Sequence, residues 1–199
     1  EDDYELFSLK LSHGYSYQFV RNVLQLNLGD GMFSEIGLLA GITMTDWSWS
    51  PLFCDVDNDG WKDLFISNGI YRRANDLDYV KFLADNDFFE SKSEAEVPDK
   101  MIYEKMPLYP YFNYIFKNNR DLTFTNMARE WGINTRSYSN GATYADLDND
   151  GDLELITNNI NDYAYIYRNN SNELSGNHFL AVILKGEGLN TRGVGARVT

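Results

Sequence analysis

The stretch "DVDNDGWKDLF" at residues 55–65 places acidic side chains at positions 1, 3, 5 and 9 of a short loop. The chain repeats this pattern as "DLDNDGDLELI" at residues 146–156. Two carboxylates about 4 Å apart repel by roughly 4 kcal/mol at an effective dielectric constant near 20. A bound divalent cation reverses the sign of this term and stabilises the folded state. The two stretches therefore predict two loops that are built around cations.

The spacing of the acidic residues predicts the ligands of each cation. Aspartates at loop positions 1, 3 and 5 converge on one point when the backbone curls, and glycine at position 6 permits the turn. Oxygen ligands suit calcium, which takes about six to eight of them, better than magnesium, which keeps its waters. The predicted ligands at positions 1, 3, 5, 7 and 9 are Asp55, Asp57, Asp59, Trp61 and Asp63 in the first loop and Asp146, Asp148, Asp150, Asp152 and Glu154 in the second.

The ligand that closes the site distinguishes these loops from EF-hands. An EF-hand has a bidentate glutamate at position 12, where this chain has Ile66 and Thr157. Position 9 is acidic in both loops, and a backbone carbonyl at position 7 completes a compact site. The flanking runs "PLFCDV" and "DLFIS" are apolar and typical of strands. We therefore expect each loop to join two antiparallel strands.

The similarity extends well beyond the loops. Residues 22–68 align with residues 113–159 at an offset of 91 without a gap. Each unit contains several short strand-like runs, and "LGDGMF" in the first unit has the composition of a tight hairpin. Repeats of this length with four short strands are typical of propeller blades. The sequence thus predicts an all-β fold, a partial β-propeller with repeats at residues 22–70 and 113–168.

The other segments follow different patterns. Residues 71–112 are expected to form a helical insertion, in which Asn75 or Asp76 caps one helix and Pro98 begins another. This insertion is expected either to line a binding face or to cover the edge of a blade. Residues 1–21 are interpreted as the end of a preceding blade or a linker. Residues 169–199 begin another module, with a strand, a Gly-rich turn and the start of a second strand.

Composition excludes several classes of protein. The net charge of −13 argues against binding to nucleic acid or to anionic membrane surfaces. No apolar run is long enough to span a membrane. The single cysteine, Cys54, is expected to be a buried strand residue. The two histidines, His13 and His178, lack the partners that acid–base or zinc chemistry requires, so catalysis is not expected.

The acidic loops and the runs before them, "NVLQLNLGDGMFSEIGLLAGI" and "NYIFKNNRDLTFTNMAREWGI", resemble FG-GAP/VCBS repeats. These repeats form the blades of integrin-α-like β-propellers. The tail "NHFLAVILKGEGLNTRGVGARV" resembles the opening of the ASPIC/UnbV module of cartilage acidic protein and of bacterial secreted proteins. The second repeat departs from the family in having "NNRDLTF" where a turn such as "GDGTF" is usual, so its hairpin is expected to differ.

The resemblance implies a function. It implies a Ca²⁺ ion in each loop and a fragment of a secreted, cell-surface or periplasmic protein of bacterial origin. We expect a non-enzymatic binding or adhesion scaffold whose partner is a protein or a glycan. Two alternatives remain: the propeller part of a calcium-dependent, lyase-like enzyme that degrades polysaccharide, and a structural spacer before the next module.

Overall fold

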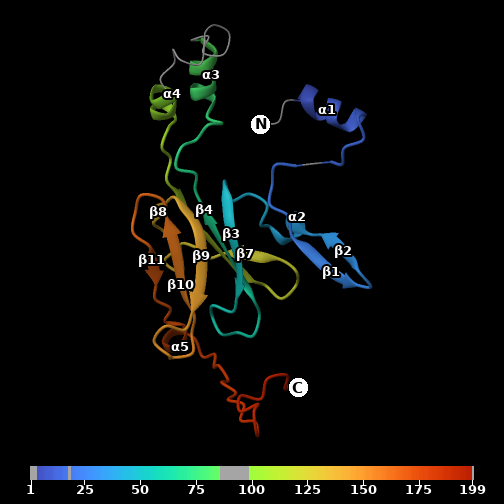
Figure 1. The fold of residues 1–199 in the computed structure, drawn as a ribbon, viewed down its shortest axis with the longest axis vertical. Helices are drawn as coiled ribbons and strands as arrows, with labels where there is room; N and C mark the ends of the chain where they lie inside the picture. Colours follow the sequence, from blue (N-terminus) through green and yellow to red (C-terminus); the bar gives the residue numbers. More distant parts are fainter. Residues whose placement is uncertain (1–3, 18, 86–98, 199) are drawn as a thin grey trace.

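A computed structural model describes residues 4–17, 19–85 and 99–198 (Figure 1). Antiparallel sheets dominate these residues, as predicted for an all-β fold, and they do not close into a ring. The helices are α1 (Tyr4–Ser12), α2 (Gly37–Ala40), α3 (Leu77–Asp85), α4 (Asp99–Lys105) and α5 (Ser171–Leu174). The strands are β1 (Gln25–Gly29), β2 (Met32–Glu35), β3 (Ser48–Cys54), β4 (Asp63–Asn68), β5 (Tyr111–Phe112), β6 (Tyr114–Asn118), β7 (Phe124–Asn126), β8 (Arg136–Ser137), β9 (Ser139–Ala145), β10 (Glu154–Asn159) and β11 (Tyr165–Tyr167).

The sheets are out of phase with the repeats in the sequence. The largest sheet has the order β3-β4-β6-β7, so it takes two strands from each repeat. Leu64 on β4 lies opposite Phe116 on β6, and the pairing is antiparallel. A second sheet has the order β11-β10-β9, and β1 and β2 form a separate pair. The first repeat therefore ends with β3 and β4 of the largest sheet, and the second repeat begins with β6 and β7, the hairpin that completes it.

Strand β4 lies at the centre of the packing because both of its faces are buried. Phe65 joins a cluster with Cys54 and Ile115, which packs toward the sheet that contains β10. The neighbouring residues Leu64 and Ile66 point the other way, into a cluster with Ala40 and Phe116. Cys54 is buried as predicted, and burial raises the pKa of its thiol to about 12.

The two equivalent hairpins use different turns. Between β1 and β2, Asp30 (φ 52°) and Gly31 (φ 77°) form a two-residue turn with both φ angles positive. Between β6 and β7 the turn includes Arg120 (φ 68°) and Leu122 (φ 71°), which are not glycines. The difference expected from "NNRDLTF" is thus present, and the second hairpin adopts left-handed backbone without the residue that favours it.

The described part of the predicted insertion at residues 71–112 contains the helices α3 and α4. Asp76 caps α3, since its Oδ1 accepts a hydrogen bond of 3.0 Å from the N–H of Tyr79. Pro98 lies outside the described residues, and α4 is described from Asp99. At the base of the insertion, Arg72 donates to the carbonyls of Glu104 (3.1 Å) and Met106 (2.9 Å). In Figure 1, α3 and α4 project from the end of the sheets opposite α5.

The strands predicted for the tail are absent from its described residues. Residues 177–198 contain no strand, and their apolar side chains, including Leu180 and Ile183, are exposed. A strand needs a neighbour for its backbone hydrogen bonds, and none pairs with this segment in the described chain. Helix α1 lies where the sequence predicts the end of a blade or a linker. None of the described helices has the length and apolar character required to cross a bilayer.

Candidate metal centres

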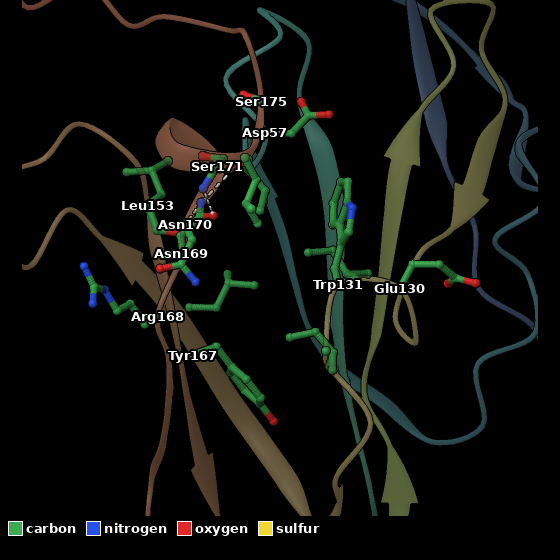
Figure 2. Close-up of a pocket in the computed structure, with 16 residues that line it drawn as sticks. Asp57, Glu130, Trp131, Leu153, Tyr167, Arg168, Asn169, Asn170, Ser171 and Ser175 are labelled. Carbon is green, nitrogen blue, oxygen red and sulfur yellow. Dashed lines mark hydrogen bonds between the residues drawn. The ribbon is translucent and has the colours of Figure 1, made fainter.

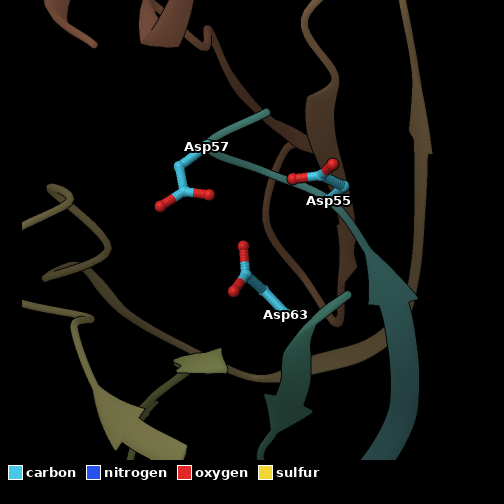
Figure 3. A group of neighbouring side chains, drawn as sticks. All are labelled: Asp55, Asp57 and Asp63. Atoms are coloured by element: carbon cyan, nitrogen blue, oxygen red, sulfur yellow. The ribbon is translucent and has the colours of Figure 1, made fainter. Parts of the chain in front are cut away.

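Two groups of three carboxylates lie at matching places in the two repeats. Side-chain oxygens of Asp55, Asp57 and Asp63 all lie within 4.8 Å of one another (Figure 3). Oxygens of Asp146, Asp148 and Glu154 form the second group within the same distance. The structure therefore brings together positions 1, 3 and 9 of each predicted loop.

The carboxylate at position 1 accepts hydrogen bonds from backbone N–H groups of its own loop. Asp55 accepts hydrogen bonds from the N–H groups of Asp59 (3.0 Å) and Gly60 (2.9 Å). In the second loop, Asp146 accepts a bond of 3.1 Å from the N–H of Gly151. The glycines have φ angles of 87° and 89°, which is why position 6 requires glycine.

The carboxylate at position 9 ties its loop to the next strand of the sheet. Asp63 is fully buried, and its two oxygens accept hydrogen bonds from the N–H groups of Val56 (3.1 Å) and Asn118 (3.0 Å). Glu154 does the same with Leu147 (2.8 Å) and Asn169 (3.4 Å). Position 9 is thus a structural tie as well as a candidate ligand.

Asn118 and Asn169 also hold the loops, and the sequence did not predict this role. The side-chain amide of Asn118 donates to the carbonyl of Lys62 (3.0 Å), and that of Asn169 donates to the carbonyl of Leu153 (3.3 Å). Both carbonyls belong to position 8 of a loop. The available signal was an asparagine that ends the strand-like run in "IFKN" and in "IYRN".

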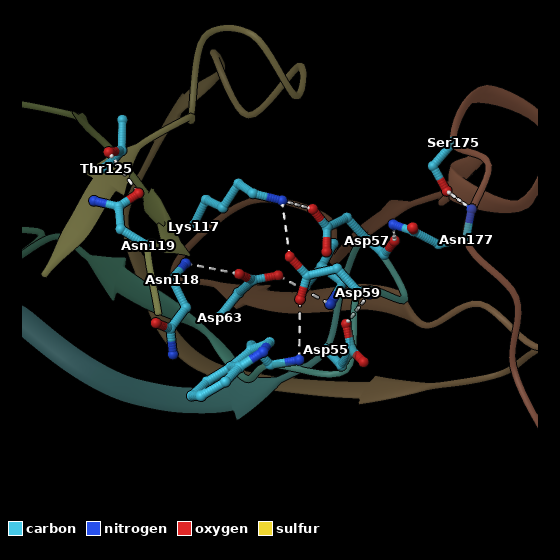
Figure 4. A network of polar contacts seen from close by, with 12 residues as sticks. Asp55, Asp57, Asp59, Asp63, Lys117, Asn118, Asn119, Thr125, Ser175 and Asn177 are labelled. Atoms are coloured by element: carbon cyan, nitrogen blue, oxygen red, sulfur yellow. Dashed lines mark hydrogen bonds and ion pairs between the residues drawn. The ribbon is translucent and has the colours of Figure 1, made fainter. Parts of the chain in front are cut away.

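The residues at position 5 lie outside the two carboxylate groups. Asp59 faces two cations instead, Lys117 at 3.2 Å and Arg120 at 3.0 Å. Figure 4 shows that Lys117 lies between Asp59 and Asp57, and it pairs with both. Burial opposes ionisation of Asp59, but hydrogen bonds from Arg120, from the N–H of Trp61 and from Lys117 outweigh it and lower its pKa. Asp59 is thus paired with basic side chains, and its own side chain is only 5 % exposed.

The second loop has a different arrangement at positions 5 and 7. Asp150 accepts a hydrogen bond of 3.0 Å from the N–H of Asp152, and this bond lowers the pKa of Asp150. Asp152 was predicted to offer its backbone carbonyl, as was Trp61 in the first loop. The Asp152 side chain is itself buried, and burial raises its pKa. The hydroxyl of Ser171 and the N–H of Asn172 donate to it at 3.4 and 3.3 Å.

The first group of carboxylates has the electrostatic character of a cation site. Burial, and to a smaller extent the nearby charge of Asp57, raise the pKa of Asp63 to about 6 against the lowering effect of two backbone hydrogen bonds. Oδ1 of Asp57 is buried and has no hydrogen-bond partner within the described residues. A divalent ion would satisfy this oxygen and favour the ionised form of Asp63. An all-oxygen donor set fits a hard cation such as Ca²⁺.

Asparagine side chains connect the two loops. Asn58 donates to the carbonyl of Gly151 at 3.4 Å, and Asn177 donates to the carbonyl of Asp57 at 2.8 Å. Asn169 also reaches back to the first loop, where it donates to the carbonyl of Val56 at 2.7 Å. The two candidate sites therefore share one hydrogen-bonded framework.

A pocket of about 500 Å³ opens beside this framework, between the two larger sheets. Trp131 and Tyr167 stand on opposite sides of it, and Glu130 and Arg168 lie at its edge (Figure 2). Asp57 contributes to the wall next to the first loop. Aromatic surfaces combined with a few polar groups are typical of ligand pockets.

Comparison with known proteins agrees with part of the resemblance. A family model described as an FG-GAP-like repeat matches residues 5–66, a range that includes the first acidic loop. No curated protein matches the chain. The match supports an FG-GAP repeat protein, and it ends before the second repeat and the tail.

Proposed function

We propose that this chain is part of a calcium-stabilised β-propeller that serves as a binding scaffold, with one Ca²⁺ ion in each acidic loop. The observation that carries the proposal is the pair of matching carboxylate groups, Asp55, Asp57 and Asp63 in one repeat and Asp146, Asp148 and Glu154 in the other. Both repeats keep this arrangement of mutually repelling carboxylates, and a bound cation would offset the repulsion.

The sheet arrangement supports the propeller part of the proposal. Four-stranded antiparallel sheets that pack face to face are the unit of propeller architecture. The β3-β4-β6-β7 sheet has this composition, and apolar clusters join one of its faces to the sheet that contains β10 and the other face to α2. The FG-GAP-like match to residues 5–66 favours the same fold. Residues 169–199 would then lead into a further module.

The chemistry supplied by the ion is structural. Ca²⁺ would neutralise the carboxylates at positions 1, 3 and 9 and fix the loop that contains them. The protein groups that prepare the site are the N–H donors at positions 5 and 6, which orient Asp55, and the donors from Val56 and Asn118, which orient Asp63. Dissociation constants in the range of about 10⁻⁴–10⁻³ M are typical of extracellular calcium modules. An affinity in this range is expected if the protein is secreted or lies at the cell surface.

The proposed scaffold binds a protein or a glycan without chemical turnover. The pocket between the sheets supports this role because it combines Trp131 and Tyr167 with the charged groups of Glu130 and Arg168. The helices α3 and α4 add a projecting surface near one end of the sheets. Binding of glycans or peptides without cleavage would support the scaffold. Release of unsaturated or hydrolysed products from polysaccharides would favour the enzymatic alternative.

Calcium titration by calorimetry, after the protein has been stripped with a chelator, tests the metal sites. We expect two binding events and a rise in the melting temperature with calcium. Asp55→Asn and Asp146→Asn should each remove one event, and the double variant should remove both. Glu187→Gln changes an exposed carboxylate outside both loops and serves as the control. Unchanged binding in the double variant would contradict the proposal.

A further inference from the structure

Strand β1 has an open edge. It pairs with β2, and no other described strand lies beside it. The equivalent strand of the second repeat, β6, is not at an edge, because β4 pairs with its other side. The same hairpin is therefore present twice, once with its neighbour and once without it.

The two hairpins match residue by residue. Gln25 lies opposite Glu35 in the first, as Phe116 lies opposite Asn126 in the second. At the offset of 91, Gln25 corresponds to Phe116 and Glu35 corresponds to Asn126. The open edge of β1 thus has the same orientation and register as the edge of β6 that receives β4.

The open hairpin exposes apolar side chains whose counterparts are better covered. Val23 is 60 % exposed, whereas its counterpart Tyr114 is half-buried next to β4. Leu24 is half-buried, whereas its counterpart Ile115 is 1 % exposed. An exposed apolar strand edge of this kind is a site for pairing with another strand.

Asn27 indicates what kind of strand fits. Its Oδ1 accepts a hydrogen bond of 2.9 Å from the N–H of Gly29, just as Asn118 and Asn169 accept from the residue two positions later. In those two cases, the side-chain amide donates to position 8 of an acidic loop. The side-chain amide of Asn27 has no partner among the described residues.

We propose that the open edge of β1 binds an antiparallel β-hairpin whose turn is a third acidic loop of the same pattern. The carboxylate at position 9 of that loop accepts from the N–H of Asn27, and the carbonyl at position 8 accepts from its side chain. The residues opposite Gln25, Leu24 and Val23 correspond to Leu64, Phe65 and Ile66 on β4. The docking follows from the strands alone; only the metal in the third loop depends on the proposed function.

The test supplies a hairpin of known sequence. A second copy of residues 139–159, which contains β9, the second loop and β10, is joined to the N-terminus by a long Gly/Ser linker. Leu155→Cys in the added copy should lie opposite Gln25→Cys on β1 and form a disulfide. Ile156→Cys is the control, shifted by one residue and directed to the other face. We expect at least tenfold more of the in-register product, and slower hydrogen exchange of the amides of residues 23–27.

Asn27→Ala should lower the yield of the in-register disulfide several-fold, because the loop then loses its donor. Asn134→Ala, which changes an exposed asparagine elsewhere, should not. Equal yields from the in-register and shifted cysteines would overturn the proposal, as would exchange protection at β7 or β11 without protection at β1. In-register docking in chelator, without calcium binding, would retain this proposal and contradict the proposed metal function.

Discussion

Lys117 on β6 places its ammonium group against the carboxylate of Asp57, so the first acidic loop already contains a positive charge. The same ammonium lies 3.2 Å from Asp59. Arg168 occupies the equivalent place beside the second loop, but its guanidinium is 3.7 Å from Asp148 and both groups are largely exposed. The two loops therefore differ in how strongly an internal cation competes with a metal ion.

Replacing Lys117 with methionine should have opposite effects on metal binding and on metal-free stability. Removal of the ammonium frees Asp57 for the ion, so calcium should bind the first loop about three- to tenfold more tightly, a range that allows for partial solvent screening. The metal-free protein should melt at a lower temperature, because Asp57 loses the ammonium group and Asp59 keeps only Arg120 as its partner. Calorimetric titration and thermal melts in chelator measure the two effects.

Arg168→Met is the matched control for that experiment, since its ion pair is longer and more exposed. Its effect on calcium affinity should be smaller than that of Lys117→Met. Equal effects of the two substitutions would contradict the assignment of Lys117 as the stronger competitor.

Asp63 should give the metal-free protein a distinctive dependence on pH. Its pKa is about 6 in the folded chain because of burial, against roughly 3.9 when unfolded. Between these values the folded state holds a proton that the unfolded state has released. The free energy of unfolding should therefore fall as pH rises from about 4 to 6, by on the order of 2–3 kcal/mol, and then level off.

Urea unfolding in chelator from pH 4 to 7 measures this dependence. Other carboxylates titrate in the same range, so the informative quantity is the wild-type profile minus that of Asp63→Asn. Saturating calcium should reverse the trend, since the ion competes with the proton and is released on acidification. Parallel profiles for the wild type and the variant would show that Asp63 is not responsible.

Asn169→Ala should destabilise the chain by about 1–3 kcal/mol, because it leaves two carbonyls without their donor. These carbonyls belong to Val56 in the first loop and Leu153 in the second. Asn118→Ala removes the donor of a single carbonyl, that of Lys62, and should cost less. Denaturant unfolding provides the comparison, and a larger loss for Asn118→Ala would contradict the bridging role of Asn169.

Leu122→Gly should stabilise the second hairpin. Leu122 has a φ of 71°, a conformation that costs a residue with a Cβ roughly 1–2 kcal/mol. Glycine relieves this cost but loses more entropy on folding, so the net gain should be about 0.5 kcal/mol. The reverse change, Gly31→Leu at the equivalent place in the first hairpin, should destabilise. Thermal melts of both variants test the prediction, and a lower melting temperature for Leu122→Gly would contradict it.

The sequence revealed those parts of the site that lie within one short stretch. Positions 1, 3 and 9 were found because alternation and repetition mark them. Lys117 and Asn118 were not found, since they reach the first loop from a strand that follows the insertion, and only the sheet register places them there. The sequence also did not show that one sheet takes strands from both repeats. A repeating pattern does not indicate at which strand a sheet begins.

The strands predicted for the tail are absent for a related reason. Local composition at residues 179–184 favours a strand, but composition does not supply the neighbour that a strand requires. The helix after Asp76 could be predicted because a helix forms its hydrogen bonds internally. The cap at Asp76 and the spacing of the apolar residues after it were sufficient to indicate α3.

The insertion leaves the sheet after β4 and returns through β5 to β6. Strands β4 and β6 are hydrogen-bonded neighbours. The chain must therefore close the same short gap whatever lies between, and doubling the length of a flexible connection costs only about 0.6 kcal/mol. Selection for the fold consequently places little restraint on how long this segment is. Among relatives that share the sheet, variation in length should gather here, and a foreign domain grafted at this position should leave both acidic loops able to bind their ions.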